Sequence, residues 1–197
     1  REIPEEIMIG VGGNFENILF ITKNGYLWCL DSEGNAIWKI FIDGEVLTTP
    51  VINNKKVYVR LANYEILQID LKQGDIDWRY IHSSPALAFD GTSALTFSDG
   101  VIYGGFGAGK IVAVHQKSGA FIWEANISQV KGSTDIDRLN DVLSKPIIND
   151  SEVYAVSTSG DLTAIDRTNA SITWTRKISS FNDITFDGFD IYLAHKS

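Results

Sequence analysis

The sequence of 197 residues contains one cysteine, one methionine and no long apolar run. A single cysteine excludes an intrachain disulfide and a cage of thiolate metal ligands. No apolar run approaches the roughly 20 residues needed to cross a bilayer as a helix. The charged start, residues 1–6, lacks the apolar segment and cleavage site of a signal peptide. These features leave two alternatives open, a cytosolic protein or a targeting segment upstream of this sequence.

Positive charge is also scarce, with 17 Lys and Arg against 25 Asp and Glu, a net charge of −8. Binding to nucleic acid needs clustered Lys and Arg to neutralise phosphates, so the composition argues against it. The same deficit disfavours adsorption to an anionic membrane surface. Hydrophobic residues make up 44% of the chain and aromatic residues 11%, which is ample for a packed core.

Patterns of catalytic chemistry are incomplete wherever they begin. The stretch Gly104–Lys110 fits the spacing of a phosphate loop, but Ile111 stands where the Mg²⁺-binding hydroxyl belongs, so we predict a hairpin turn. No Gly-x-Ser-x-Gly nucleophile motif occurs. The three histidines, His82, His115 and His195, have no His or Cys at metal-ligand spacing. The acidic stretch with Asp135, Asp137 and Asp141 lacks the Gly and the closing Glu of a calcium loop. We therefore predict no enzyme, no catalytic residue, no metal and no cofactor.

What the chain does have is a repeated phrase that ends in tryptophan, at Trp38, Trp78, Trp123 and Trp174. Successive tryptophans lie 40, 45 and 51 residues apart, the range of one four-stranded propeller blade. An apolar strand precedes each one and ends at Asp31, Asp70, His115 or Asp166. Generic core tryptophans of a β-sandwich are the alternative, but the nearly constant spacing from this position to Trp favours the propeller.

A second recurring unit precedes the phrase, a strand, a polar turn and another strand, at 50–59, 95–103 and 146–155. It is a hairpin signal, so each repeat yields four short antiparallel strands. Such a meander buries both faces only by stacking on its neighbours around an axis. We predict an all-β fold, a partial β-propeller of about four to five four-stranded blades. Each tryptophan is expected on the outer strand, where it caps an interface between sheets.

The repeats divide the chain at roughly 7–42, 46–81, 86–127 and 142–178, with a half-blade at 181–197. We predict that residues 1–197 form a single partial propeller, a fragment of a larger ring. Two residues before the Asp or His, the repeats carry Cys29, Gln68, Ala113 and Ala164. Because this slot mostly holds small residues, we expect Cys29 to be a buried hydrophobic residue and not a reactive thiol.

The blade phrase is similar to that of the pyrroloquinoline-quinone-type propellers, which are usually eight-bladed. Three segments, 131–142, Gly160–Asp166 and 180–184, resemble more specifically the BamB family of outer-membrane assembly lipoproteins of Gram-negative bacteria. The resemblance implies a non-catalytic scaffold at the periplasmic face of the outer membrane. It implies a lipid anchor upstream of this sequence as the only link to the membrane, and the POTRA domains of BamA as the protein partner.

The family's partner contacts correspond here to two loops. The first loop is 86–91, where Leu87 matches an apolar contact, Phe89 replaces another, and Asp90 stands where an Arg is expected. The second is 140–143, where Asp141 matches an acidic contact and Leu143 replaces a second acid. The connection from Trp123 to Pro146 is longer than that from Trp38 to Pro50, and long loops on rigid scaffolds often bind partners. Strand alternation also allows Leu87 and Phe89 to be ordinary core residues.

Two other functions stay open from the sequence. A quinone-dependent dehydrogenase uses the same repeat, but many such enzymes need an adjacent cysteine pair that a single cysteine excludes. A generic propeller that binds peptides or glycans at one end is the third interpretation. Uptake of the quinone with calcium would distinguish the enzyme from the two binding proteins.

Overall fold

The computed structural model describes residues 5–83, 93–127, 142, 144–158, 161–178 and 184–193. Within these residues every regular element is a β-strand, apart from one short 3-10 turn. The predicted all-β fold is therefore confirmed. The chain divides into two compact units, 1–82 and 83–197, which are described separately.

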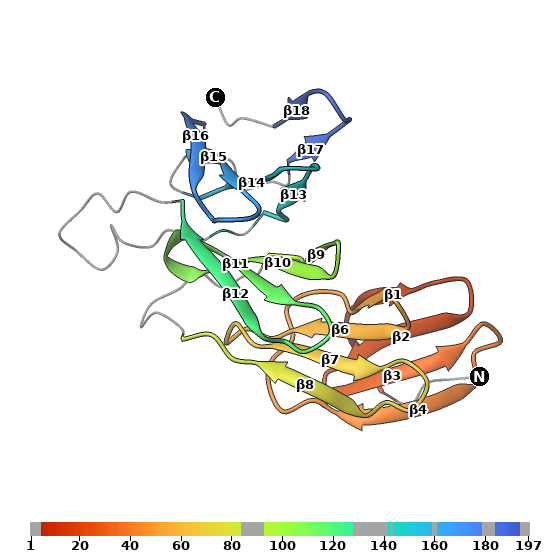
Figure 1. Cartoon of the computed structure of the whole chain (residues 1–197). Coiled ribbons are helices and arrows are strands. Elements are labelled where there is room, and N and C mark those ends of the chain that lie inside the picture. The colour runs from red at the N-terminus through yellow and green to blue at the C-terminus, as the bar shows by residue number, and fades with distance from the viewer. Residues whose placement is uncertain are drawn as a thin grey trace. The chain divides into compact units, whose positions relative to one another are not determined.

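The first unit holds two four-stranded antiparallel sheets whose strands follow one another in sequence order (Figure 1). The first sheet comprises β1 (Ile7–Gly13), β2 (Asn17–Thr22), β3 (Tyr26–Asp31) and β4 (Ala36–Phe41). The second comprises β5 (Val51–Asn53), β6 (Lys56–Arg60), β7 (Ile66–Asp70) and β8 (Ile76–Tyr80). Short Asn-, Asp- and Gly-containing turns join neighbouring strands, so each sheet is the meander that the repeats predict.

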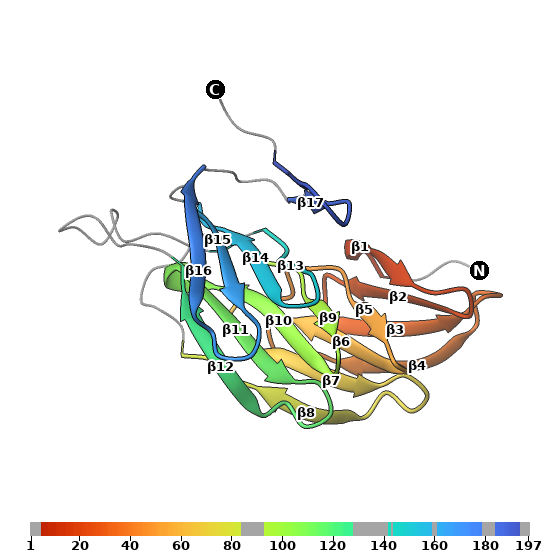
Figure 2. The ribbon, with the colours of Figure 1, turned by 45° about the horizontal axis from the view of Figure 1, so that its top comes forward.

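The second unit holds two more four-stranded antiparallel sheets and a two-stranded hairpin (Figure 2). Its first sheet comprises β9 (Thr96–Ser98), β10 (Val101–Phe106), β11 (Lys110–His115) and β12 (Phe121–Asn126). Its second comprises β13 (Ile147–Ile148), β14 (Glu152–Val156), β15 (Asp161–Asp166) and β16 (Ile172–Lys177). The hairpin pairs β17 (Thr185–Phe186) with β18 (Ile191–Tyr192).

The glycine-rich stretch forms the hairpin turn expected of it. Strands β10 and β11 pair in continuous register and are joined by the 3-10 turn η1 (Gly107–Gly109). Ala108 and Gly109 adopt left-handed φ values of 58° and 69° there. A strand follows the glycines in place of the helix that a phosphate loop needs, so the phosphate-loop interpretation is excluded.

Apolar side chains fill the space between the two sheets of the first unit. Leu19 and Ile21 of β2 face Val57 and Val59 of β6 in one buried cluster. Cys29 belongs to this cluster, is fully buried, and has a thiol whose pKa is raised to about 11 by burial. The expectation that Cys29 is a buried hydrophobic residue is confirmed.

In the second unit, sheet β13–β16 is covered on both faces. Val153 and Ala155 of β14 pack with Trp123 in a cluster shared with sheet β9–β12. The alternate residues Tyr154 and Val156 pack in a second cluster, which reaches Ile184 beside hairpin β17–β18. Because successive side chains of a strand point to opposite faces, the near-continuous apolar run of β14 fits a blade packed between two others.

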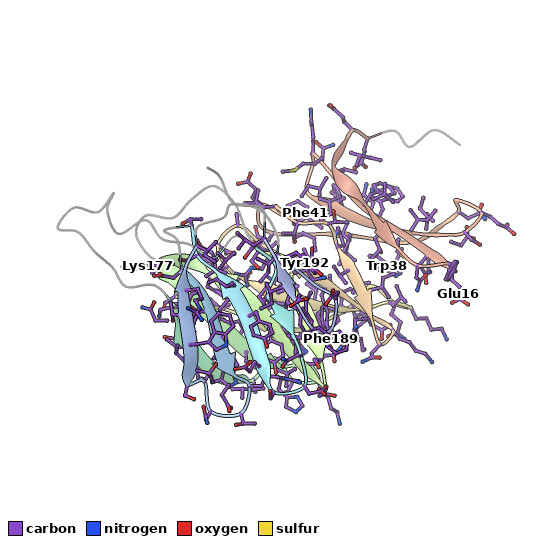
Figure 3. The ribbon with its side chains drawn as sticks, turned by 90° about the horizontal axis from the view of Figure 1, so that it is seen from above. Glu16, Trp38, Phe41, Lys177, Phe189 and Tyr192 are labelled. Carbon is purple, nitrogen blue, oxygen red and sulfur yellow. The ribbon has the colours of Figure 1, made fainter. Side chains whose placement is uncertain are left out.

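All four repeat tryptophans occupy one position in their sheets. Each lies on the outermost strand, directly opposite the slot residue of the strand before it; the pairs are Cys29 and Trp38, Gln68 and Trp78, Ala113 and Trp123, and Ala164 and Trp174. A bulge follows this pair in every sheet. Small residues at three of the four slots leave room for the indole ring across the strand pair, whereas the longer Gln68 lies opposite Trp78. Trp38, on β4, is labelled in Figure 3.

Candidate functional site

The five residues expected to contact a partner, Leu87, Phe89, Asp90, Asp141 and Leu143, lie outside the described residues. The structure does describe the chain at the ends of both predicted loops. Ser93 follows the first loop, and Val142 and Ser144 lie within and after the second. All three residues belong to the second unit.

A buried hydrogen bond joins these two parts of the chain. The Ser93 hydroxyl donates to the Ser144 carbonyl at 2.8 Å, and both residues are almost completely buried. Next to it, the Ser144 hydroxyl donates to the Val156 carbonyl at 3.2 Å. Three residues further along, the Thr96 hydroxyl donates to the Pro146 carbonyl at 2.5 Å. The segments that follow the two loops therefore run side by side into β9 and β13.

Gly105 of β10 has no Cβ atom, and this leaves space for the backbone of Val142. Val142 is 1% exposed, and its amide donates to the Phe106 carbonyl at 3.3 Å. A Cβ atom on Gly105 would lie 2.3 Å from the Val142 carbonyl oxygen and 2.8 Å from Cβ of Ser93. Only glycine fits, because the backbone of Val142 approaches β10 more closely than any side chain allows. We call Ser93, Gly105, Val142 and Ser144 the loop junction.

An arginine clamp holds the two sheets of the second unit together. The Arg167 guanidinium donates to Asp99 Oδ2 in the β9–β10 turn at 2.7 Å, and to Ser98 Oγ at the end of β9 at 3.0 Å. It also donates to the carbonyls of Asn149 and Asp150 at 3.0 and 3.1 Å. The Arg167 hydrogen bond, followed by that of Ser98, lowers the pKa of Asp99 below its usual value. The clamp fixes the sheets on which the loop junction is built.

Catalytic geometry does not emerge from the part of the chain that the structure describes. No group of three or more His, Cys, Asp and Glu side chains there is placed to hold a metal ion. His115 is exposed, and its Nδ1 accepts the Lys117 amide at 3.3 Å, a hydrogen bond within the turn that follows β11. His82 Nδ1 lies 3.2 Å from the Tyr80 hydroxyl. His195, Asp135 and Asp137 lie outside the described residues.

Each unit has one further surface feature of a kind that can bind a ligand. A groove of about 490 Å³ in the first unit has a mixed lining of acidic, basic and apolar side chains; it comprises Glu16, Asn17, Ile37, Lys55, Asp70, Leu71, Lys72 and Gln73. Glu16 is labelled in Figure 3. In the second unit, Phe189 at the tip of hairpin β17–β18 is 94% exposed (Figure 3). Neither feature gathers groups of one charge or chemistry, so neither defines a ligand.

The loop junction itself had no sequence prediction. Its one local signal is a glycine inside a strand pattern, which indicates a close backbone approach. The two serines carry no such signal, because the residues that they join are 51 positions apart.

Comparison with known proteins gives the same family along almost the whole chain. A family model described as outer membrane protein assembly factor BamB matches residues 5–197. The BamB protein of Yersinia pestis is 33% identical over 189 residues, covering 95% of this chain and 48% of its own length. That of Escherichia coli is 34% identical over 166 residues, covering 84% of this chain and 42% of its own. This chain spans about half the length of the curated relatives that it matches.

Solved structures agree on the fold. The crystal structure of BamB from Moraxella catarrhalis aligns with a TM-score of 0.83 at 28% identity, covering 91% of this chain and 56% of that one. A europium-containing methanol dehydrogenase aligns with a TM-score of 0.67 at 14% identity, covering 85% of this chain and 41% of that one. The second likeness concerns the fold alone. Among the described residues, no helix has the length and apolar character to span a membrane.

Proposed function

Since this chain belongs to the family of the outer membrane protein assembly factor BamB, we propose that it is part of a non-catalytic scaffold in the assembly of outer-membrane β-barrel proteins. The scaffold works by surface recognition and makes or breaks no covalent bond. Its partner is the POTRA region of BamA, and its place is the periplasmic face of the outer membrane, held by a lipid anchor. In this proposal residues 1–197 form one continuous array of blades within a larger ring.

The proposed contact surface consists of Leu87, Phe89, Asp90, Asp141 and Leu143. One observation carries it: the buried junction ties the ends of the two loops together across 51 residues of sequence. Two loops with a common base can present apolar and acidic side chains to one partner. Apolar anchors beside charged rim residues are the usual composition of a protein interface.

The experiment is a titration of the protein into the purified POTRA domains of BamA, with wild type and an Asp141→Arg variant. We expect the substitution to weaken binding by about 1–3 kcal/mol, the range for an interface residue of this kind. Asp75→Arg is the matched control, because it makes the same charge change at an exposed turn of the first unit. Circular dichroism establishes that all three proteins are folded.

No binding by a folded wild-type protein would contradict the proposed partner. Equal weakening by both variants would mean that net charge, and not the second loop, controls the affinity. The quinone-dependent dehydrogenase, which shares the blade repeat, would then be the next function to test. Uptake of pyrroloquinoline quinone in the presence of calcium, followed by its absorbance, would favour an enzyme over a scaffold.

A further inference from the structure

We infer that the loop junction is the positioning element of the partner contact, so that Ser93, Gly105, Val142 and Ser144 set the affinity without touching the partner. The inference rests on the proposed function. It adds four buried residues of the second unit to the five proposed contacts, and of the four only Val142 lies within a segment that carries the family resemblance.

The four residues are too deeply buried to be contacts themselves. Ser93 is 0% exposed, Val142 1% and Ser144 2%. Any effect of these side chains on a partner must therefore pass through the chain that they hold. Val142 is directly bonded to both Asp141 and Leu143, and consecutive Cα atoms lie about 3.8 Å apart. A displacement of Val142 therefore moves the attachment points of two proposed contact residues.

The junction also restricts the position of Val142. The Ser93 hydroxyl donates to a buried carbonyl, and a buried hydrogen bond is costly to leave unmade. The Val142 backbone lies against Gly105, so it has no room to move toward β10. A contact surface that is ordered before binding loses less conformational entropy on binding, which strengthens the affinity.

Gly105→Ala is the sharpest perturbation. The new Cβ would lie 2.3 Å from the Val142 oxygen, whereas ordinary contact begins near 3.4 Å, so Val142 must retreat by about 1 Å. Gly105 does not have a positive φ, so the effect is steric and not conformational. Ser93→Ala is the milder variant, because it removes one hydrogen bond and adds no atoms.

The first unit offers a matched control. A Cβ on Gly12 of β1 would lie 2.1 Å from the Pro50 carbonyl oxygen, a close approach of the same kind. Gly12 likewise has no positive φ. Gly12→Ala should therefore cost similar stability, but it lies in the unit that carries none of the five proposed contacts.

The experiment titrates wild type, Gly105→Ala, Ser93→Ala, Gly12→Ala and the double variant Gly105→Ala/Asp141→Arg into the POTRA domains. We expect Gly105→Ala to weaken binding at least about fivefold and Ser93→Ala about twofold, with Gly12→Ala close to wild type. The double variant should bind no worse than whichever single variant, Gly105→Ala or Asp141→Arg, binds less tightly, because both changes remove the same contact. Full additivity in the double variant, or equal weakening by Gly12→Ala, would overturn the inference.

A measurement without the partner separates this inference from the proposed function. The Val142 amide should be protected from hydrogen exchange in the wild type and in Gly12→Ala, and exchange faster in Gly105→Ala. If wild type fails to bind POTRA domains, the proposed function fails and the inference fails with it, although the exchange pattern still tests the geometry. If wild type binds, and Gly105→Ala binds equally while Val142 loses protection, the inference alone fails.

Discussion

In both units a tryptophan indole links one sheet to the next, but the side chain of the residue that accepts its hydrogen bond differs. In the first, Trp38 Nε1 donates to the Leu71 carbonyl at 2.8 Å. In the second, Trp123 Nε1 donates to the Arg167 carbonyl at 2.9 Å. Both acceptors directly follow the aspartate that closes the apolar strand, Asp70 or Asp166. Each bond links one sheet to the next within its unit.

The residue that supplies the carbonyl differs completely between the units. The side chain of Leu71 packs against the apolar cluster of the first unit. That of Arg167 reaches Asp99, Ser98 and two backbone carbonyls. The repeat therefore specifies a backbone acceptor for the indole, and the side chain at that position can add either apolar or polar contacts.

The largest expected effect comes from removing the indole that links the two sheets within each unit. Trp123→Ala should lower the free energy of unfolding by about 3–5 kcal/mol, since a large buried ring and its hydrogen bond are lost together. Trp38→Ala should cost the same or somewhat less, because its ring is partly buried. Urea denaturation followed by circular dichroism measures this. A much smaller loss for Trp123→Ala would show that the Arg167 clamp holds the second unit without the indole.

The turn beneath each tryptophan gives the next comparison. Gly74 has a φ of 79°, and a Cβ there would lie 2.9 Å from the Trp38 ring. In the second unit the same place is taken by Ala170, with a φ of 62°. We expect Gly74→Ala to cost about 2–3 kcal/mol, from left-handed strain and displacement of the ring.

Ala170→Gly should change the stability by less than about 0.5 kcal/mol. Relief of strain is offset by the greater entropy of the unfolded chain and by the lost contact of Ala170 with the Trp123 cluster. Thermal unfolding of both variants makes the comparison. A gain in stability from Ala170→Gly as large as the loss from Gly74→Ala would mean that left-handed strain alone, and not the position of the Trp38 ring, controls this turn.

The blades could be predicted because their signals are local. Turn residues, strand alternation and the distance from Asp to Trp all lie within one repeat, and the structure confirms the four-stranded antiparallel sheets. Even the slot of Cys29 and Ala113 was visible in the sequence, although its cause was not. In the structure each slot lies directly opposite a tryptophan on the next strand, and Gln68 opposite Trp78 shows that a longer residue is also accommodated there.

The loop junction and the arginine clamp could not be predicted in this way. Ser93 and Ser144 are joined across 51 residues, and Arg167 and Asp99 across 68. Serine and arginine are common on surfaces, so their types do not reveal burial or a partner. Gly105 was noticed only as part of a false phosphate loop. The five contact residues expected from the family resemblance stay a prediction.

A smaller effect distinguishes the turn that lacks an aspartate. Asp70 Oδ1 accepts the amides of Lys72 and Gln73, both at 2.9 Å. In the third blade His115 accepts one amide at 3.3 Å. His115→Asp should therefore raise the free energy of unfolding by about 0.5–1 kcal/mol, as the shorter carboxylate bonds form. His115→Ala is the control, and an equal gain for both variants would contradict this explanation.

The smallest effect concerns the ion pair that the second unit has in place of the apolar contact of Leu71. The Arg167 hydrogen bond lowers the pKa of Asp99 in the folded protein, so the pair stabilises the fold above the unfolded pKa near 3.9. This stabilisation is lost as the pH falls through the lower folded value. Because the Asp99 side chain is 78% exposed, solvent screens the pair and the effect at pH 7 is slight.

We expect Asp99→Asn to leave the urea midpoint at pH 7 almost unchanged and to flatten its decline below about pH 4. Arg167→Met should flatten the same decline, because either change removes the pair. At pH 7, however, Arg167→Met should cost more stability, since Arg167 also donates to the Asn149 and Asp150 carbonyls. Equal costs at pH 7 would show that the carbonyl bonds contribute little. The clamp would then be only a surface ion pair, and the Trp123 indole would hold the two sheets of the second unit just as Trp38 does in the first.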